Sequence, residues 1–372
     1  MDLLTLALSL VLSTTLTAAA PNYTADAALC VPQVQMAEAA CPQMGPSAYT
    51  ANYTQARVPD VAPALPLAPL ERYDPVVDFT YGRVTTPEAP LFASPAEGVA
   101  GNAARSIGTG FIFVSLMETV EEAGQTFYRI RTGEYIRATD VGEVKVTNFQ
   151  GMLFAEQPRY PVAWIVVGNV RPSVRPGTPA LSSTPRMFRK TVVQLYATVR
   201  VGEWDWYLIG PNQWVEQRAV SRLNLNPPPE GVTGRWIQVD LYEQTLAAYE
   251  GDRLVYATLI SSGLNEWPTR PGLFNIYVKL LADRMRGAYR PDGSDYYFLE
   301  AVPWVMYYDG QRALHGEYWH DGLGFKRSHG CVNLAPLDAR WLFEWAEVGM
   351  PVWVYDPSGQ TPTDLDEAGG AP

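Results

Sequence analysis

Charge, histidine and cysteine are all scarce in this sequence of 372 residues. Charged residues make up 18% of the chain, and it holds three histidines and three cysteines. The 28 lysines and arginines are outnumbered by 39 aspartates and glutamates, which gives a formal net charge of −11. Because an acidic chain without a basic block is repelled by phosphates, we expect no nucleic-acid partner and no binding to anionic lipid. Hydrophobic residues reach 47%, enough for a sizeable core.

Long apolar runs are also scarce, and the one that stands out lies at the N-terminus. Leu3–Leu16 is interrupted only by serine and threonine, and Ala18–Ala20 before Pro21 has the form of a signal-peptide cleavage site. The run is shorter than the ~20 residues that a membrane-spanning helix needs. We therefore predict a signal peptide at residues 1–20, export of the protein, and no stable membrane span beyond the signal. A retained anchor or a buried helix is the alternative.

The number and spacing of the cysteines are consistent with export. Cys30 and Cys41 lie close together, and we predict a disulfide between them, with two reduced thiols as the alternative. Cys331 is left as a lone thiol in an oxidising compartment, which favours a functional role for it. Residues 21–100 also hold 12 of the 31 prolines, which predicts an extended linker there.

Beyond the linker the pattern is typical of β-structure. Residues 101–225 alternate apolar and polar positions between turns, and Tyr128-Arg129-Ile130 recurs 79 residues later as Tyr207-Leu208-Ile209. A proline-rich break follows at Asn226–Pro229. We place a second domain at residues 231–356 and a flexible tail at 357–372, and we expect a mainly β fold.

The second domain is predicted to contain a β-meander, two more strands, one helix and a closing strand. The helix is indicated by large apolar residues at helical spacing. The predicted elements, in order, are strands Trp236–Leu241, Thr245–Tyr249 and Leu254–Ile260, strands Phe274–Lys279 and Val302–Tyr307, helix Pro336–Val348, and strand Pro351–Tyr355.

The residues that carry chemistry gather near the C-terminus. All three histidines, His315, His320 and His329, fall within 15 positions, and Cys331 lies two residues after the last. Acyl transfer needs a nucleophile, a base and donors for the developing oxyanion. A thiol is mostly protonated at neutral pH, and a neighbouring imidazole can remove its proton. Three histidines and a cysteine can also hold zinc, which is the alternative.

The residues around Cys331 suit the same chemistry. Positive charge from Lys326 and Arg327 can favour the thiolate, although both can equally be solvated loop residues. Gly330 permits a sharp turn and a close approach of substrate to backbone N–H groups. Such N–H groups can form an oxyanion hole, worth ~3 kcal/mol per donor.

Ser328-His329-Gly330-Cys331-Val332-Asn333, preceded by His315-Gly316, resembles the signature of the L,D-transpeptidase catalytic domain, the YkuD family. Two further stretches fit this resemblance. The first has the form I-x-V-D-L-x-x-Q-x-L-x-x-Y from Ile237 to Tyr249. The second is Thr269–Phe274, which departs from the family's commoner T-P-x-G in one loop position. The resemblance covers about a third of the chain.

The resemblance implies a role for each residue of the signature. Cys331 is the expected nucleophile and His315 the expected base, oriented by a backbone carbonyl that we assign to Gly316. His329, Gly330 and Cys331 are expected to form the oxyanion hole. Spacing alone leaves open which imidazole contacts the thiol. The residues expected to contact substrate or support the loop are Ser328, Asn333, Arg327, Tyr318 and His320.

The implied protein is a peptidoglycan L,D-transpeptidase of the cell wall or periplasm. Its partners are the stem peptides, it needs no cofactor and no metal, and we expect a monomer. The implied fold is a β-sandwich catalytic domain with one or two short helices, preceded by small β-barrels that resemble SH3-like modules in residues 101–225. The alternatives are a catalytically inactive cell-wall-binding protein and a zinc-dependent wall amidase.

Overall fold

The computed structural model describes residue 58, residues 63–288 and residues 290–361. The predicted signal peptide and both cysteines of the predicted Cys30–Cys41 bridge lie outside these residues, as does the tail from residue 362. Within the described ranges, no helix combines the length and the apolar character needed to cross a membrane.

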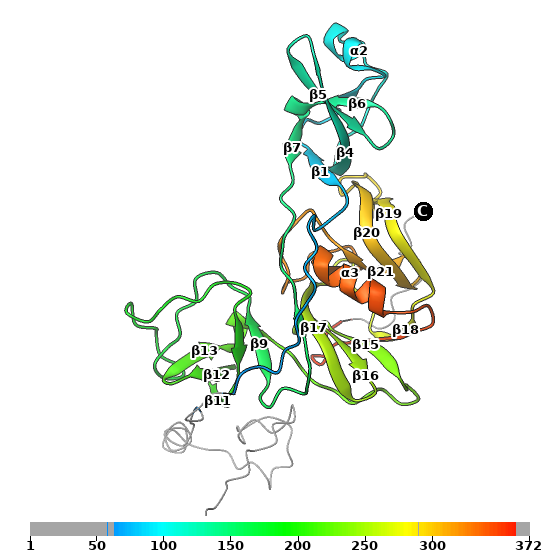
Figure 1. Cartoon of the computed structure of the whole chain (residues 1–372). Helices are drawn as coiled ribbons and strands as arrows, with labels where there is room; N and C mark the ends of the chain where they lie inside the picture. Colours follow the sequence, from blue (N-terminus) through cyan, green and yellow to red (C-terminus); the bar gives the residue numbers. More distant parts are fainter. Residues whose placement is uncertain (1–57, 59–62, 289, 362–372) are drawn as a thin grey trace, which may run out of the picture.

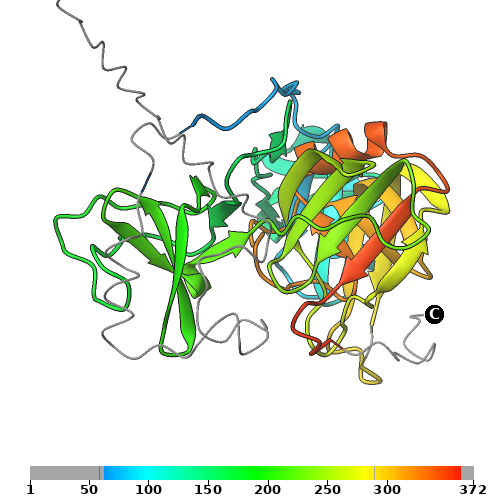
Figure 2. The ribbon, with the colours of Figure 1, turned by 90° about the horizontal axis from the view of Figure 1, so that it is seen from below.

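The fold is mainly β, as predicted, and the described part of the chain holds two short α-helices, α2 (Pro95–Ala100) and α3 (Pro336–Trp345). Figure 1 shows a central body that carries α3, and two smaller β lobes that project from it in different directions. In Figure 2 the lobe of residues 160–223 again stands apart from the central body.

One layer of the central body is the predicted meander. Antiparallel strands pair in the order β15, β16, β17, and β23 adds in parallel beside β15 with β18 at its far edge. Nearly every residue of the meander is buried, since one face meets the second layer and the other meets the segment around residues 149–154. The bounds are β15 (Arg235–Asp240), β16 (Thr245–Glu250), β17 (Arg253–Ser261), β18 (Gly272–Asn275) and β23 (Pro351–Tyr355).

The second layer begins where β17 ends. Ile260 and Ser261 of β17 pair with β22, and the sheet continues through β21 and β20 to β19. The main apolar core lies between the two layers, and α3 packs over β20 and β21 (Figure 1). The bounds are β19 (Val278–Gly287), β20 (Tyr297–Asp309), β21 (Arg312–Gly316) and β22 (Val332–Leu334).

Three predicted boundaries in this domain were wrong. The single strand predicted at 274–279 is divided, because the N–H of Ile276 bonds to Met350 while that of Tyr277 bonds to Tyr307, so the chain passes from one layer to the other. The strand predicted at 302–307 extends over the whole of β20, in a hairpin with the charged strand β19. The helix ends at Trp345, before the exposed Val348.

The first β lobe contains residues 80–143. Its strand β4 pairs in parallel with β20, so the lobe extends the sheet of the second layer. Strand β1 and helix α2 belong to it, and the linker predicted at 21–100 is therefore wrong from residue 80 onward. The short helix is stabilised by Ser94, which caps its N-terminus. The strands are β1 (Thr80–Val84), β2 (Pro90–Leu91), β3 (Arg105–Ser106), β4 (Phe111–Glu122), β5 (Gln125–Ile130), β6 (Tyr135–Arg137) and β7 (Val141–Glu143).

The second β lobe contains residues 160–223, and it confirms the internal repeat. Strands β5 to β7 with their 3₁₀ turn (Ala138–Asp140) recur 79 residues later as β12 to β14 with a 3₁₀ turn at Gln217–Ala219. The resemblance of the lobes to SH3-like modules stays a prediction. The strands of this second lobe, and β8 before it, are β8 (Met152–Leu153), β9 (Val162–Ile165), β10 (Val192–Gln194), β11 (Ala197–Val201), β12 (Trp204–Gly210), β13 (Gln213–Glu216) and β14 (Val220–Arg222).

Candidate active site

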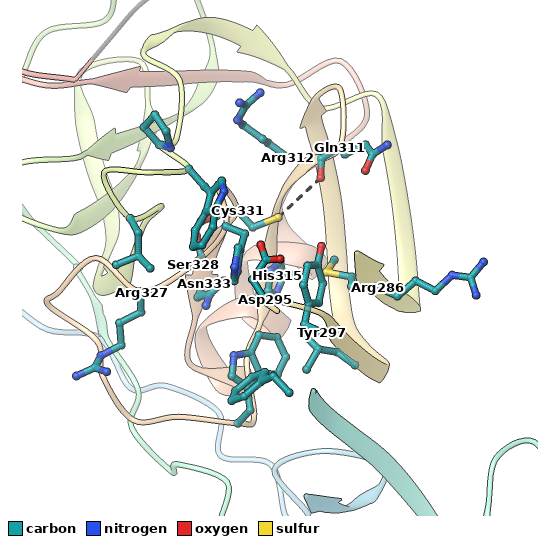
Figure 3. A pocket seen from close by; sticks show the side chains of 18 of the residues that line it. Arg286, Asp295, Tyr297, Gln311, Arg312, His315, Arg327, Ser328, Cys331 and Asn333 are labelled. Atoms are coloured by element: carbon teal, nitrogen blue, oxygen red, sulfur yellow. Dashed lines mark hydrogen bonds between the residues drawn. The ribbon is translucent and has the colours of Figure 1, made fainter. Parts of the chain in front are cut away.

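A cleft of about 1520 Å³ opens on the face of the sheet of the second layer, β19 to β22, which we call the catalytic sheet. Its walls are β19, the turn between β20 and β21, the segment 264–270 and the β21–β22 loop, which we define as residues 317–331. Gly110 and Phe111 of the first β lobe close one end. Cys331, His315 and Asn333 all line this cleft (Figure 3), so the structure brings together the residues that the signature singled out.

Cys331 directly precedes β22 and is partly exposed to the cleft. Its thiol donates a weak hydrogen bond to the backbone carbonyl of Gln311, with 3.8 Å between Sγ and the oxygen (Figure 3). Burial of the sulfur raises the pKa of Cys331, and the backbone N–H of Ala313 and the guanidinium of Arg312 oppose this rise only in part. The resting group is therefore a neutral thiol, which needs a base when it reacts.

His315 lines the same cleft as Cys331. It lies on β21 in register with Asn333 of the parallel strand β22, and residues in register point to the same face of a sheet. Its Nδ1 lies 3.1 Å from the carbonyl oxygen of Gly316, the expected contact, and this carbonyl requires a proton on Nδ1. Nε2 then carries the lone pair. Burial lowers the pKa of His315 to about 4, so the ring is neutral at physiological pH.

The turn before Cys331 is held by side chains. Gly330 has φ of 112°, a conformation that favours glycine, and a Cβ there would lie 3.3 Å from Nε of Arg312. Ser328 Oγ accepts from the N–H of Gly330 at 3.1 Å and donates to the carbonyl of Cys331. Thr269 donates to the carbonyl of Gly330 at 2.9 Å. Ser328 thus supports the loop, and the N–H of Gly330 is occupied by a hydrogen bond within the loop.

His329 lies between two aromatic rings. Its ring centroid is 4.1 Å from that of Trp267 and 5.3 Å from that of Tyr297, and all three residues line the cleft. Burial lowers the pKa of His329. Sequence analysis did not identify Trp267 or Tyr297, because no local pattern connects these aromatics to the signature. Trp319 lies between two of the predicted residues but was given no role, and its ring centroid is 5.7 Å from that of His315.

His320 is held by its neighbours rather than presented as a base. The N–H of Gly322 donates to its Nδ1 at 3.1 Å, and its Nε2 lies 3.2 Å from the amide of Asn333. Burial lowers the pKa of His320 to about 4, with a smaller effect of Arg327 in the same direction. Both ring nitrogens therefore have partners, which favours His315 as the group that contacts the thiol.

Glu317 sits beneath His320 and is fully buried. Its Oε2 accepts from the backbone N–H of His320 at 3.0 Å, while Oε1 has no hydrogen-bond partner. Burial raises the pKa of Glu317 to about 8, so the carboxyl stays protonated in the folded protein at neutral pH.

We expect Glu317→Gln to flatten the pH dependence of stability. Above its unfolded-state pKa of ~4.5 the unfolded carboxyl loses its proton while the folded one keeps it up to about pH 8, so the free energy of unfolding falls as pH rises through this window. The variant should match the wild type at pH 4 and exceed it at pH 8.5, by on the order of 1–3 kcal/mol. Urea unfolding at both pH values measures this, with the exposed Glu344→Gln as control. Parallel pH curves for the wild type and Glu317→Gln would contradict the assignment.

Cationic groups outnumber acidic ones around the cleft, in contrast to the acidic chain. The cations are Arg270, Arg284, Arg286, Arg312, Lys326 and Arg327, and the acids are Glu266, Asp295 and Asp309. Lys326 bonds to Asn265 and Arg327 points away from the sulfur (Figure 3). The guanidinium that lowers the pKa of Cys331 is that of Arg312, so these contacts favour the alternative in which Lys326 and Arg327 are loop residues.

Tyr318 was expected at the substrate and does not lie there. Its ring is buried and stacks on Tyr81 at 3.5 Å between centroids, and its hydroxyl donates to the carbonyl of Glu300 at 2.6 Å. The prediction for this residue was wrong because side chains next to each other in a loop can point to opposite sides. Tyr318 anchors the β21–β22 loop to the core.

The described side chains around the cleft are poorly arranged to bind a metal ion. Across residues 63–288 and 290–361, no group of three or more histidine, cysteine, aspartate or glutamate side chains is arranged to hold a metal ion. Nδ1 of His315 contacts Gly316, both ring nitrogens of His320 have partners in Gly322 and Asn333, and the ring of His329 lies 4.1 Å from that of Trp267.

Comparisons with known proteins find L,D-transpeptidases. Residues 234–354 match the YkuD family, the L,D-transpeptidase catalytic domain. YciB of Bacillus subtilis, provisionally named an L,D-transpeptidase, is 30% identical over 128 residues, which are 29% of this chain and 59% of that protein. The chain thus spans about three fifths of the length of this relative.

Solved structures match as well, among them two L,D-transpeptidases. The catalytic domain of the Enterococcus faecium L,D-transpeptidase is 28% identical, with coverage of 34% of this chain and 99% of that one and a TM-score of 0.30. An L,D-transpeptidase from Stackebrandtia nassauensis is 27% identical, with coverage of 37% and 60% and a TM-score of 0.28. Residues 234–354, which contain Cys331 and most of the cleft, thus match the L,D-transpeptidase catalytic domain of the YkuD family.

Proposed function

We propose that this protein is an exported cysteine acyltransferase that forms 3→3 cross-links in peptidoglycan. One observation carries the proposal: Cys331 opens into a cleft that also holds His315, whose Nδ1 contact with Gly316 leaves Nε2 as an unprotonated base. The family of residues 234–354 supports the choice of substrate.

In the first step the sulfur of Cys331 attacks the carbonyl carbon that joins the third stem residue to the terminal D-alanine, and His315 Nε2 takes the thiol proton. The tetrahedral oxyanion is stabilised by backbone N–H groups near Cys331. The C–N bond then breaks, and the amine of D-alanine takes the proton from His315. A thioester and free D-alanine result.

In the second step an amine of a neighbouring stem attacks the thioester carbon. His315 takes the proton of this amine, the C–S bond breaks, and His315 returns the proton to the sulfur of Cys331. The product is a new amide between two third residues. Because the thioester conserves the energy of the original amide, the exchange needs no nucleotide. Water in place of the amine gives a carboxypeptidase reaction.

The charge of the cleft supports an anionic donor. A stem tetrapeptide carries the carboxylate of its terminal D-alanine, and the arginines of the cleft can pair with it. Arg270 and Arg312 both bond to Asp309, so two guanidinium groups share one carboxylate and a positive charge is left over near Cys331. Asn333 and Arg327 stay proposed substrate contacts, and His329 with Cys331 stays a proposed part of the oxyanion hole.

The test is intact mass spectrometry of the purified protein after incubation with a carbapenem. We expect one covalent adduct on Cys331, which peptide mapping locates. Binding to isolated cell walls without any adduct would instead support an inactive wall-binding protein. Activity on stem peptides that a chelator destroys and a thiol-alkylating reagent leaves intact would support a zinc amidase.

A further inference from the structure

The β21–β22 loop holds the active-site cysteine at one end and has no regular structure, so it depends on outside partners. Its segment 321–324 lies against the second β lobe. Leu323 is buried in a cluster with Val162, Trp164 and Val166 of that lobe. A Cβ on Gly324 would lie 2.6 Å from Val166 Cγ1, so the two segments are in direct contact.

One side chain of the lobe carries the polar part of this contact. Arg189 donates from Nη1 to the carbonyl of Asp321 at 2.9 Å and from Nη2 to the carbonyl of Leu323 at 2.7 Å. Its Nε donates to the carbonyl of Val166 at 2.8 Å, which fixes the guanidinium within its own lobe. The neighbouring Lys190 pairs with the carboxylate of Asp321. A planar guanidinium can hold three carbonyls at fixed angles, which no other side chain can do.

The two carbonyls that accept from Arg189 belong to the residues on either side of Gly322. Gly322 in turn is connected by hydrogen bonds to residues that line the cleft. Its N–H donates to Nδ1 of His320, whose Nε2 touches Asn333, the register partner of His315. On its other side, the carbonyl of Gly322 accepts from Ser261 Oγ at 3.2 Å. The peptide groups on both sides of Gly322 are thus fixed between the lobe and the catalytic sheet.

We propose that Arg189 is a positioning residue: it makes the second β lobe part of the working active site by holding the β21–β22 loop so that His320 and Asn333 stay in place beside Cys331. This inference rests on the proposed function. It assigns the lobe a role in the reaction itself rather than in anchoring the protein alone, because the lobe acts on the cleft through the β21–β22 loop that it contacts.

The test compares Arg189→Ala, Arg189→Lys and Arg200→Ala in the full chain. Arg200 is the matched control, since it is a partly buried arginine of the same lobe that pairs with Asp205 and has no contact with the loop. For Arg189→Ala we expect kcat on a stem tetrapeptide and the rate of carbapenem acylation to fall about 10- to 100-fold, with little change in KM or Tm. Arg189→Lys should fall in between, because an ammonium cannot reproduce the fork.

Chemical rescue distinguishes positioning from general stability. Millimolar methylguanidinium should restore part of the rate of Arg189→Ala and leave Arg200→Ala unchanged. The proposal is overturned if Arg189→Ala is acylated at the wild-type rate, or if both alanine variants lose rate in step with Tm and neither is rescued. A wild-type protein that forms no carbapenem adduct contradicts the proposed function and this inference together.

Discussion

Cys331→Ala is expected to abolish both carbapenem acylation and turnover of stem peptides, with a loss of at least ~10⁴-fold in kcat. The fold should be kept, because the thiol is partly exposed in the cleft and the hydrogen bond that it donates to the carbonyl of Gln311 is weak. We expect a change in the free energy of unfolding below about 1 kcal/mol.

Two measurements decide this prediction. Intact mass after incubation with carbapenem reports acylation, and thermal unfolding of the same samples reports stability. Cys331→Ser is the closer control, since it keeps the shape of the side chain and removes the more reactive sulfur. A variant that turns over substrate, or one whose Tm falls steeply, would show that the thiol is a structural group.

His315→Ala is expected to lower the rate of acylation by about 10²- to 10⁴-fold, the usual effect of losing a general base. His320→Ala should cost less, because one nitrogen of that ring already has a partner in Gly322 and the other in Asn333. Comparing the two variants at pH 7, with carbapenem as the acylating agent, identifies the imidazole that contacts the thiol. An equal or larger loss in His320→Ala would contradict the assignment of His315.

We expect His315 to determine the pH dependence of acylation as well. Since the pKa of His315 is lowered to about 4 by burial, the ring stays unprotonated and able to act as a base down to about that pH. The rate constant for acylation should therefore be flat from pH 5.5 to 7 and fall only near pH 4. An acid limb close to pH 6.5, the ordinary value for histidine, would mean that the acting imidazole is not the buried His315.

The catalytic domain was largely predictable because its signals are local. The meander β15–β17 and the closing strand β23 follow apolar runs bounded by turns, and the contact of His315 with Gly316 joins adjacent residues. The internal repeat was also visible, since the second β lobe repeats the first at a fixed spacing.

What the sequence could not show depends on contacts between distant segments. Strand β19 is rich in charge and has no apolar periodicity, so only its pairing with β20 makes it a strand. Tyr318 and His320 are two positions apart, yet one enters the core and the other the cleft. Arg189 reaches the loop from more than 130 positions away in the sequence, and no spacing rule points to it. The first β lobe begins at residue 80, within the range 21–100 that the prolines predicted as a linker, because β1 pairs with β4.

The most direct test is to incubate the protein with a defined stem tetrapeptide and follow Cys331 by mass spectrometry while measuring D-alanine in solution. Our proposal predicts a tripeptide acyl group on that cysteine, one D-alanine released for each acylation, and transfer of the acyl group to an added amine. Release of D-alanine that persists in the Cys331→Ala variant, or an unmodified Cys331 throughout turnover, would contradict it.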